Sequence, residues 1–197
     1  DWMKVRPLSL ERICNGMAGL YLPVGAGWLV ASRLGIAPMG FQEPIVLLTA
    51  VHFHFTGFAA PVIAGRVGRM ARGSAARGWV ALAAGGLLLG MPLVAAGFVL
   101  SPRLKVGAVL LLVASLLSLS GWLLSNRRAL PAGLPRWLAT IAALSLPVGM
   151  SLTAVYGIGE FVGTEWITLP QMALFHGVAT AWGSRCAVCS PSGWRTL

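Results

Sequence analysis

The stretch Leu48-Thr-Ala-Val-His-Phe-His-Phe-Thr-Gly-Phe58 lies inside an apolar run from Ile45 to Gly65 that contains no Asp, Glu, Lys or Arg. A helix of about 20 apolar residues is long enough to cross the hydrocarbon core of a bilayer. His52 and His54 are therefore expected at membrane depth, where an ionisable side chain is costly and marks an ion path, a ligand site or a paired network. The alternative is structural: each imidazole only hydrogen-bonds a backbone carbonyl or a hydroxyl.

The composition of the whole chain agrees with a membrane environment. Of its 197 residues, 57% are hydrophobic and 10% are charged, against about 25% charged in an average soluble domain. The net charge of +10 does not indicate nucleic acid, because the basic residues fall in short loops and do not form a stripe with aromatics. The expected partners are the lipid bilayer and a small solute or a lipid-like ligand, with no nucleic acid. Cys186 and Cys189 form a lone C-x2-C, so no metal site is expected.

Apolar segments recur along the chain and predict an all-α, polytopic transmembrane helix bundle of about six spans. The candidate spans are residues 13–32, 45–65, 79–100, 106–125, 137–159 and 167–183. The sixth span is short, and it carries Gln171 and His176. Prolines within four of the spans each leave a backbone carbonyl that a neighbouring group must satisfy. These prolines are Pro23, Pro61, Pro92 and Pro147.

Basic residues are distributed unequally between the two sides of such a bundle. The amino terminus and the loops 66–78 and 126–136 hold ten Lys or Arg residues, and the opposite loops hold three. Because basic loops stay in the cytoplasm, this bias predicts that both termini are cytoplasmic, in a bacterial inner membrane. The start of the chain shows no signal-peptide pattern.

The organisation predicted is one transmembrane domain over residues 1–183 and a polar tail over residues 184–197. The character of the sequence changes abruptly at Ser184, where the sixth span is still short of a full crossing. Two explanations stay open. The tail is either an ordinary polar cytoplasmic tail or the product of a frameshift, since an adjacent reading frame of GC-rich codons can encode an apolar continuation.

Three imidazoles are the main candidates for a proton- or ligand-binding site. His52 and His54 point about 200° apart on a helix, so they cannot chelate one metal, and each must face a different neighbour. We therefore expect the helix over residues 45–65 to be packed on both sides. Thr49 and Thr56 lie near the His52 face and can set its tautomer. His176, in the sixth span, is the third intramembrane imidazole.

Carboxylates at the outer side complete the set of candidates. Glu160 is expected at the outer mouth of a hydrated pocket shared by the imidazoles, because gathering polar groups in one pocket avoids leaving them isolated in hydrocarbon. Glu165, in the same loop region, is a candidate for the same site, and the alternative is that it is only a solvated loop residue. Glu43 precedes Pro44 and is a further candidate. The alternative is that its charge only stabilises the N-terminus of the following helix.

The motifs around these residues resemble those of the YndJ-like family of bacterial integral membrane proteins. The resemblance rests on Glu11-Arg-Ile-Cys, on Tyr21-Leu-Pro-Val-Gly-Ala-Gly-Trp28, on the histidine stretch Leu48–Phe58 and on Met172-Ala-Leu-Phe-His-Gly177. Members are labelled transporters without an established substrate, so the resemblance implies membrane location and topology, with His52, His54 and His176 as functional positions. Family members generally have further membrane segments before the point matching Glu11 and continue as an apolar helix after His-Gly, which suggests that this chain is a fragment.

Four functions remain open from the sequence. The first is a transporter or proton-coupled membrane protein with an intramembrane histidine site. The second is a membrane-embedded enzyme acting on a lipid-like substrate, with histidine and glutamate as acid and base. The third is haem ligation by His52 or His54 together with His176, although no cofactor is otherwise expected. The fourth is a non-catalytic membrane scaffold. No nucleotide-binding or hydrolase motif occurs, so an enzyme is not the first expectation.

Overall fold

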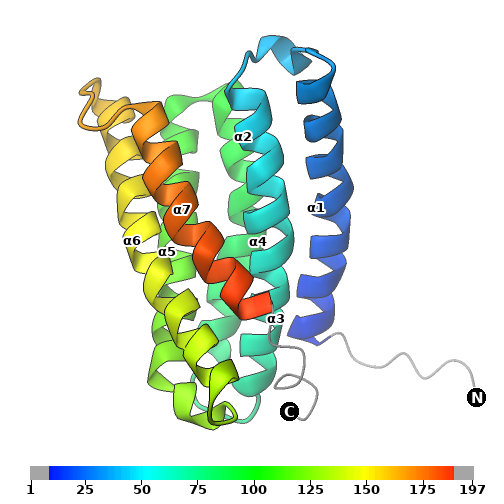
Figure 1. The fold of residues 1–197 in the computed structure, drawn as a ribbon, viewed down its shortest axis with the longest axis vertical. Helices are drawn as coiled ribbons and strands as arrows, with labels where there is room; N and C mark the ends of the chain where they lie inside the picture. The colour runs from blue at the N-terminus through cyan, green and yellow to red at the C-terminus, as the bar shows by residue number, and fades with distance from the viewer. Residues whose placement is uncertain (1–8, 189–197) are drawn as a thin grey trace, which may run out of the picture.

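The computed structural model describes residues 9–188, which are helical apart from short connections. This confirms the all-α prediction. Six long rods run along the molecule, one of them built from three consecutive elements (Figure 1). The elements are α1 (Leu10–Arg33), η1 (Pro38–Gly40), α2 (Ile45–His52), η2 (Phe53–Ala59), α3 (Ala60–Met70), α4 (Arg77–Leu100), α5 (Pro102–Ser125), η3 (Arg127–Ala129), α6 (Leu134–Val162) and α7 (Leu169–Val188).

Five of these rods are long and apolar enough to cross a membrane. They are α1, the continuous rod formed by α2, η2 and α3, and the separate helices α4, α5 and α6. The sixth rod, α7, does not meet that standard, in line with the short and more polar sixth span seen in the sequence. Its first turn is closed by a capping box, in which Gln171 N–H donates to Thr168 Oγ1 (3.4 Å) and Thr168 N–H donates to Gln171 Oε1 (3.0 Å).

The helices extend beyond the apolar runs that predicted them. The loop expected over residues 66–78 shrinks to residues 71–76, because α3 stays helical through Met70. Glu11 on α1 supports this extra turn by pairing with Arg66 (3.7 Å) and Arg69 (3.3 Å). At the other end of the chain, α7 continues to Val188, past the predicted span that ended at residue 183, and the division into a domain and a polar tail stays a prediction. Residues 189–197 of the predicted tail lie outside the described residues.

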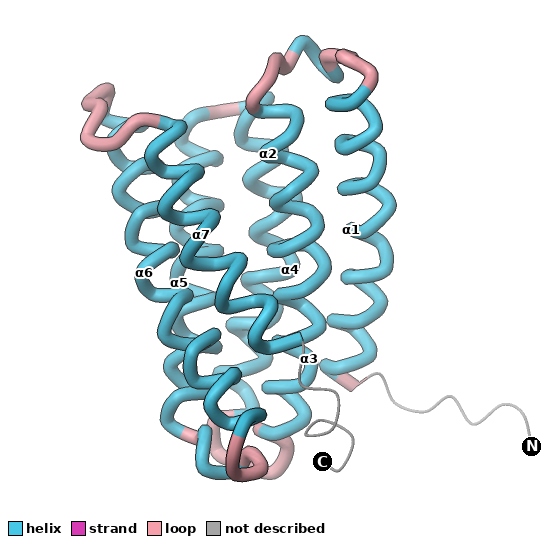
Figure 2. Tube along the Cα trace, viewed as in Figure 1, coloured by secondary structure: helices cyan, strands magenta, loops and turns pink. Residues whose placement is uncertain are grey.

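The rod from α2 to α3 occupies a central position. It lies between α1 and α7 and packs against α4 (Figure 1), which agrees with the expectation that this helix has neighbours on both sides. Its middle section, η2, is a π-helix (Figure 2 draws the rod as unbroken helix). Pro61 follows directly and cannot donate an N–H, and the N–H of Ala60 already reaches back five residues to the Phe55 carbonyl. The wide turn therefore sits where the ordinary hydrogen-bond ladder is interrupted.

Two of the in-span prolines show how the carbonyls they free are satisfied. Pro92 frees the carbonyl of Leu88, which accepts a hydrogen bond from the Tyr21 hydroxyl on α1 at 2.7 Å. Pro147 frees the carbonyl of Ala143, which accepts a short hydrogen bond from the buried Ser120 hydroxyl on α5. Each proline thus ties its helix to a neighbouring helix through a hydroxyl.

The loops at the two ends of the bundle differ in their charged residues. The loops 71–76 and 126–133 lie together at one end (Figure 1), which we call the basic end, and the loops 34–44 and 163–168 lie at the other, which we call the acidic end. The half of the bundle near the basic end is filled by one cluster of buried apolar side chains. Leu87, Leu116, Leu123 and Ala143 belong to it. The half near the acidic end holds a smaller cluster, Tyr21, Phe53 and Met91, and is otherwise hollow.

Candidate functional site

A cavity of about 360 Å³ occupies the half of the bundle near the acidic end. Its wall is contributed by α2, η2, α4, α5, α6 and α7, and most of the lining side chains are apolar. Leu116 and Met150, which also belong to the apolar cluster of the other half, close its inner end. Apolar side chains of that cluster therefore lie between the histidines and the basic end. We call this space the histidine cavity.

The structure brings two of the three imidazoles together in this cavity. His52 comes from the last turn of α2 and His176 from the middle of α7, and both line the cavity wall. Their ring centroids are 6.1 Å apart and their planes differ by 10°. Two residues separated by more than a hundred positions in the chain thus form one pair of parallel rings.

Hydrogen bonds fix which nitrogen of each ring is available. His52 Nδ1 lies 2.8 Å from the carbonyl of Leu48, and His176 Nδ1 lies 2.9 Å from the carbonyl of Gly149. Because a carbonyl oxygen only accepts, each neutral ring carries its hydrogen on Nδ1 and keeps a lone pair on Nε2. Among the described residues, no hydrogen bond to either Nε2 is found. The pair can therefore take up a proton or bind a donor group.

A line of polar side chains on α6 connects the pair to the acidic end. Thr153, Tyr156 and Glu160 follow one another at helical spacing and all line the cavity. Thr153 Oγ1 lies 2.9 Å from His176 Nδ1. Glu160 Oε1 accepts a hydrogen bond from Lys105 Nζ at 2.5 Å. The mostly apolar cavity thus has a polar edge along α6, with imidazoles at its inner end and an ion pair at its outer end.

The ion pair is held by α5 as well as by α6. Lys105 lies in the first turn of α5, and its Nζ is 4.7 Å from the centroid of the Phe98 ring, which belongs to α4. The side chain of Lys105 is 18% exposed, whereas that of Glu160 is 41% exposed. The positive partner is therefore the more deeply placed of the two.

The threonines predicted near His52 do lie on the same cavity wall. Thr49 and Thr56 both line the cavity. The hydroxyl of Thr49 donates to the carbonyl of Ile45 at 2.8 Å. The tautomer of His52 is set by the Leu48 carbonyl, and neither threonine makes that bond. The expectation that a threonine sets the tautomer is therefore wrong, because the carbonyl one turn back on the same helix makes that bond.

His54 faces the other side of its helix and does not line the histidine cavity. Its Nδ1 lies 2.8 Å from the carbonyl of Ala50. Its ring packs against α1 at Gly25, where an added Cβ would be 2.9 Å from His54 Nδ1. The two histidines of the motif thus address different neighbours, as their spacing predicted. The expectation that the imidazoles share one pocket is wrong for His54.

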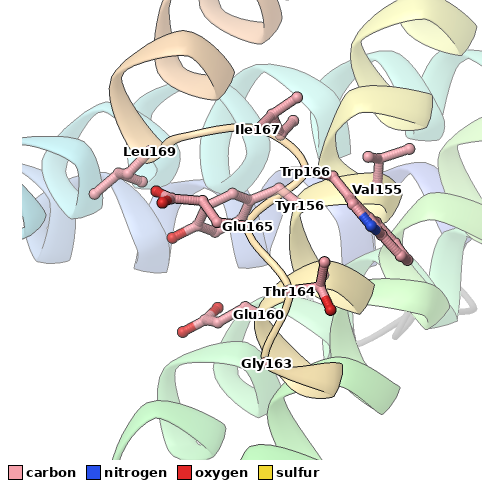
Figure 3. Close-up of a pocket in the computed structure, with 10 residues that line it drawn as sticks. Val155, Tyr156, Glu160, Gly163, Thr164, Glu165, Trp166, Ile167 and Leu169 are labelled. Atoms are coloured by element: carbon pink, nitrogen blue, oxygen red, sulfur yellow. The ribbon is translucent and has the colours of Figure 1, made fainter.

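The remaining carboxylates take other places. Glu43 Oε2 accepts from the N–H of Leu47 at 3.2 Å, so Glu43 caps the start of α2 and does not reach the histidines. Glu165 lines a second pocket, of about 270 Å³, at the loop between α6 and α7. Figure 3 shows this loop pocket, in which the side chains of Tyr156, Glu160 and Glu165 extend in the same direction. Tyr156 and Glu160 line both spaces.

Three cavity residues were not identified from the sequence. Thr153 and Tyr156 precede Glu160 at spacings of seven and four residues, and this helical register is a signal that could have placed them on one face. Lys105 fell just outside the predicted span 106–125 and was assigned to a loop. Its pairing with Glu160 depends on how α5 and α6 meet, which no pattern along the chain encodes.

Comparison with known proteins places the chain in a family. Residues 2–184 match the YndJ-like protein family. The chain belongs to this family. It is 30% identical over 179 residues to the uncharacterized membrane protein YndJ of Bacillus subtilis (strain 168), a match that covers 89% of this chain and 31% of that protein. The chain therefore spans about a third of the length of that relative. No solved structure matches.

Proposed function

We propose that this chain forms the solute- and proton-binding part of a transporter-type membrane protein, with His52 and His176 as the groups that take up the proton. The observation that carries the proposal is the meeting of these two residues, from different helices, in one cavity with an ion pair at its mouth. Imidazole changes its charge near neutral pH, which suits proton exchange. A pair of ionisable groups at membrane depth is costly to maintain without a use.

The proposal includes an orientation. The basic end, with the loops 71–76 and 126–133, faces the cytoplasm of a bacterium, and the acidic end faces outward. Both termini are then cytoplasmic. Reporter fusions after Arg72 and after Ser101 are expected to report opposite compartments, and one shared compartment would contradict the orientation.

The proposed exchange is one-sided in the conformation described. Protons enter from the acidic end along the edge formed by Glu160, Tyr156 and Thr153 and stop at His176, because apolar side chains fill the half of the bundle beyond. Transport across the membrane then needs a second conformation that opens the basic end. The Lys105–Glu160 pair, with the more exposed Glu160, is the first polar contact that an entering group meets.

Proton flux in proteoliposomes tests the proposal. The chain is reconstituted with the pH-sensitive dye pyranine inside, and the internal pH is followed after an external acid jump. We expect His52→Ala and His176→Ala to abolish the flux that the unchanged chain supports. His54→Ala is the matched control, because His54 lies on the same rod but outside the cavity, and it should retain most of the flux. Equal flux in all four proteins, above that of empty vesicles, would assign the histidines a scaffold role.

A second candidate function has support from the cavity wall. The lining is mostly apolar and closed toward the basic end, and it brings His52 and Glu160 into one space. That arrangement also suits a membrane-embedded enzyme acting on a lipid-like substrate, with these residues as acid and base. Mass spectrometry of lipids incubated with the chain distinguishes the two functions, since an enzyme produces a His52-dependent mass change. Haem ligation by the pair stays a prediction, which the visible absorbance of the purified chain tests.

A further inference from the structure

The ion pair at the mouth of the histidine cavity restricts which ligands can enter. Lys105 and Glu160 neutralise each other at 2.5 Å. A ligand that carries a single charge either adds an unbalanced charge beside this pair or leaves one of the two partners without its own. Leaving a partly buried charge without its partner is strongly unfavourable. A ligand with both an ammonium and an anionic group can instead pair with Glu160 and Lys105 together, so no charge is left alone.

The two partners of the ion pair differ in how well water can solvate them when a ligand leaves one of them unpaired. Glu160 is 41% exposed and Lys105 is 18% exposed. A purely anionic ligand leaves Glu160 to the solvent, which screens it. A purely cationic ligand leaves Lys105, which is more deeply placed, with the Phe98 ring as its remaining contact among the described residues. The expected order of affinity is therefore zwitterion, then anion, then cation.

The rest of the cavity wall determines the size and polarity of the part of the ligand that carries no charge. Beyond the ion pair the cavity is lined by apolar side chains such as Val109, Leu112 and Met172. A cavity of about 360 Å³ lies at the small end of the range of pockets that bind small molecules, about 300–1,000 Å³. A complete two-chain phospholipid is larger than this. The geometry suits a small body with an aliphatic or aromatic group.

We propose that the histidine cavity binds a zwitterion with a small apolar body, its anionic group paired with Lys105 and its ammonium with Glu160. This rests on the proposed function in that it assigns a ligand class to the same cavity. Two sources offer this chemistry: a free amino acid with an apolar side chain, or the zwitterionic headgroup of a phospholipid inserted from the bilayer.

Three matched compounds test the charge requirement on the unchanged chain. They are L-leucine, 4-methylpentanoate, which lacks the ammonium, and 3-methylbutylamine, which lacks the carboxylate. Equilibrium binding to the purified chain in detergent is measured for each by calorimetry. We expect leucine to bind at least about tenfold more tightly than either single-charge compound, with the amine weakest. Equal affinity for all three, or no binding of leucine at millimolar concentration, would overturn the proposal.

Substitutions at the ion pair test the assigned contacts. Lys105→Met and Glu160→Gln should each remove the advantage of leucine over the single-charge compounds, and the exchanged pair Lys105→Glu with Glu160→Lys should restore it. Arg103→Gln is the matched control, because Arg103 also lies in the first turn of α5 but does not line the cavity. Unchanged leucine affinity in both single variants contradicts the proposal. If these variants do not insert, the compound series decides alone.

The lipid composition of the bilayer distinguishes the two sources of the zwitterion, a free amino acid and a lipid headgroup. Leucine affinity is compared in nanodiscs of phosphatidylethanolamine and of phosphatidylglycerol. Weaker leucine binding in phosphatidylethanolamine alone shows competition by a lipid headgroup, and equal affinity shows that the ligand is a free zwitterion. The proton-flux measurement contains no leucine, so flux without leucine binding defeats this inference and leaves the proposed function standing.

Discussion

At the scale of single residues, the two nitrogens of an imidazole have separate tasks. Nδ1 of His52, His54 and His176 each lies within 2.9 Å of a backbone carbonyl. This is the structural role that the sequence left open for histidine at membrane depth. It does not compete with a binding role, because in His52 and His176 the other nitrogen is left on the wall of a cavity. The carbonyl bond holds the ring, and the lone pair of Nε2 stays available.

Gly149 keeps His176 in place by having no side chain. A Cβ at this position would lie 2.6 Å from Thr180 Cγ2 and 3.2 Å from His176 Nδ1. Gly149→Ala is therefore expected to push α7 away from α6 and to destabilise the chain by about 1–3 kcal/mol. The free energy of unfolding in mixed micelles measures this, and proton flux should fall with it.

Gly27→Ala is the control for that substitution. Gly27 also lies inside a helix, but a Cβ there would meet no atom within 4 Å. It should leave both stability and flux unchanged. If Gly149→Ala is as neutral as the control, α6 and α7 do not pack as closely as described.

At the scale of helices, the prolines connect the elements that form the site. The sequence predicted that each in-span proline needs a partner for the carbonyl it frees, and the hydroxyls of Tyr21 and Ser120 serve Pro92 and Pro147. It could not predict which hydroxyl serves which proline, because the partner lies on another helix. Pro61 is accommodated differently, by the π-helix that contains His54.

The Ser120–Ala143 bond can be measured by a double-mutant cycle. Ser120→Ala leaves the carbonyl freed by Pro147 without a partner, and we expect a loss of about 0.5–1.5 kcal/mol in the free energy of unfolding. In a Pro147→Ala background the carbonyl regains its helical N–H donor, so the same change should cost less. Ser118→Ala is the control, since that hydroxyl bonds the Ala114 carbonyl of its own helix. Equal costs in both backgrounds would show that the bond does not compensate for Pro147.

At the scale of the whole molecule, the bundle divides into a packed half and a hollow half. The pattern of apolar runs predicted the helices and which loops share an end, because both follow from length and hydropathy along the chain. The opposed directions of His52 and His54 followed from helical geometry. The cavity did not follow, since it depends on how side chains from five rods fail to fill one space. Lys105 was missed for that reason, whereas Tyr156 shares a helical face with Glu160 that the register along the chain could have shown. Helix α7 runs past the predicted span because a helix can continue beyond its apolar stretch.

The central claim is that His52 and His176 act as one pair in a cavity from which His54 is excluded. Nitrogen-15 solid-state NMR of the histidine-labelled chain in bilayers tests it most directly, with each ring assigned by His→Gln substitution. Above neutral pH all three rings should show the hydrogen on Nδ1. His176→Gln should shift the ring-nitrogen signals of His52, and His52→Gln those of His176, while the His54 signals stay unchanged in both variants, because only the stacked pair shares the cavity. His52 and His176 signals that do not respond to each other's substitution, or His54 signals that move with either one, would contradict the account.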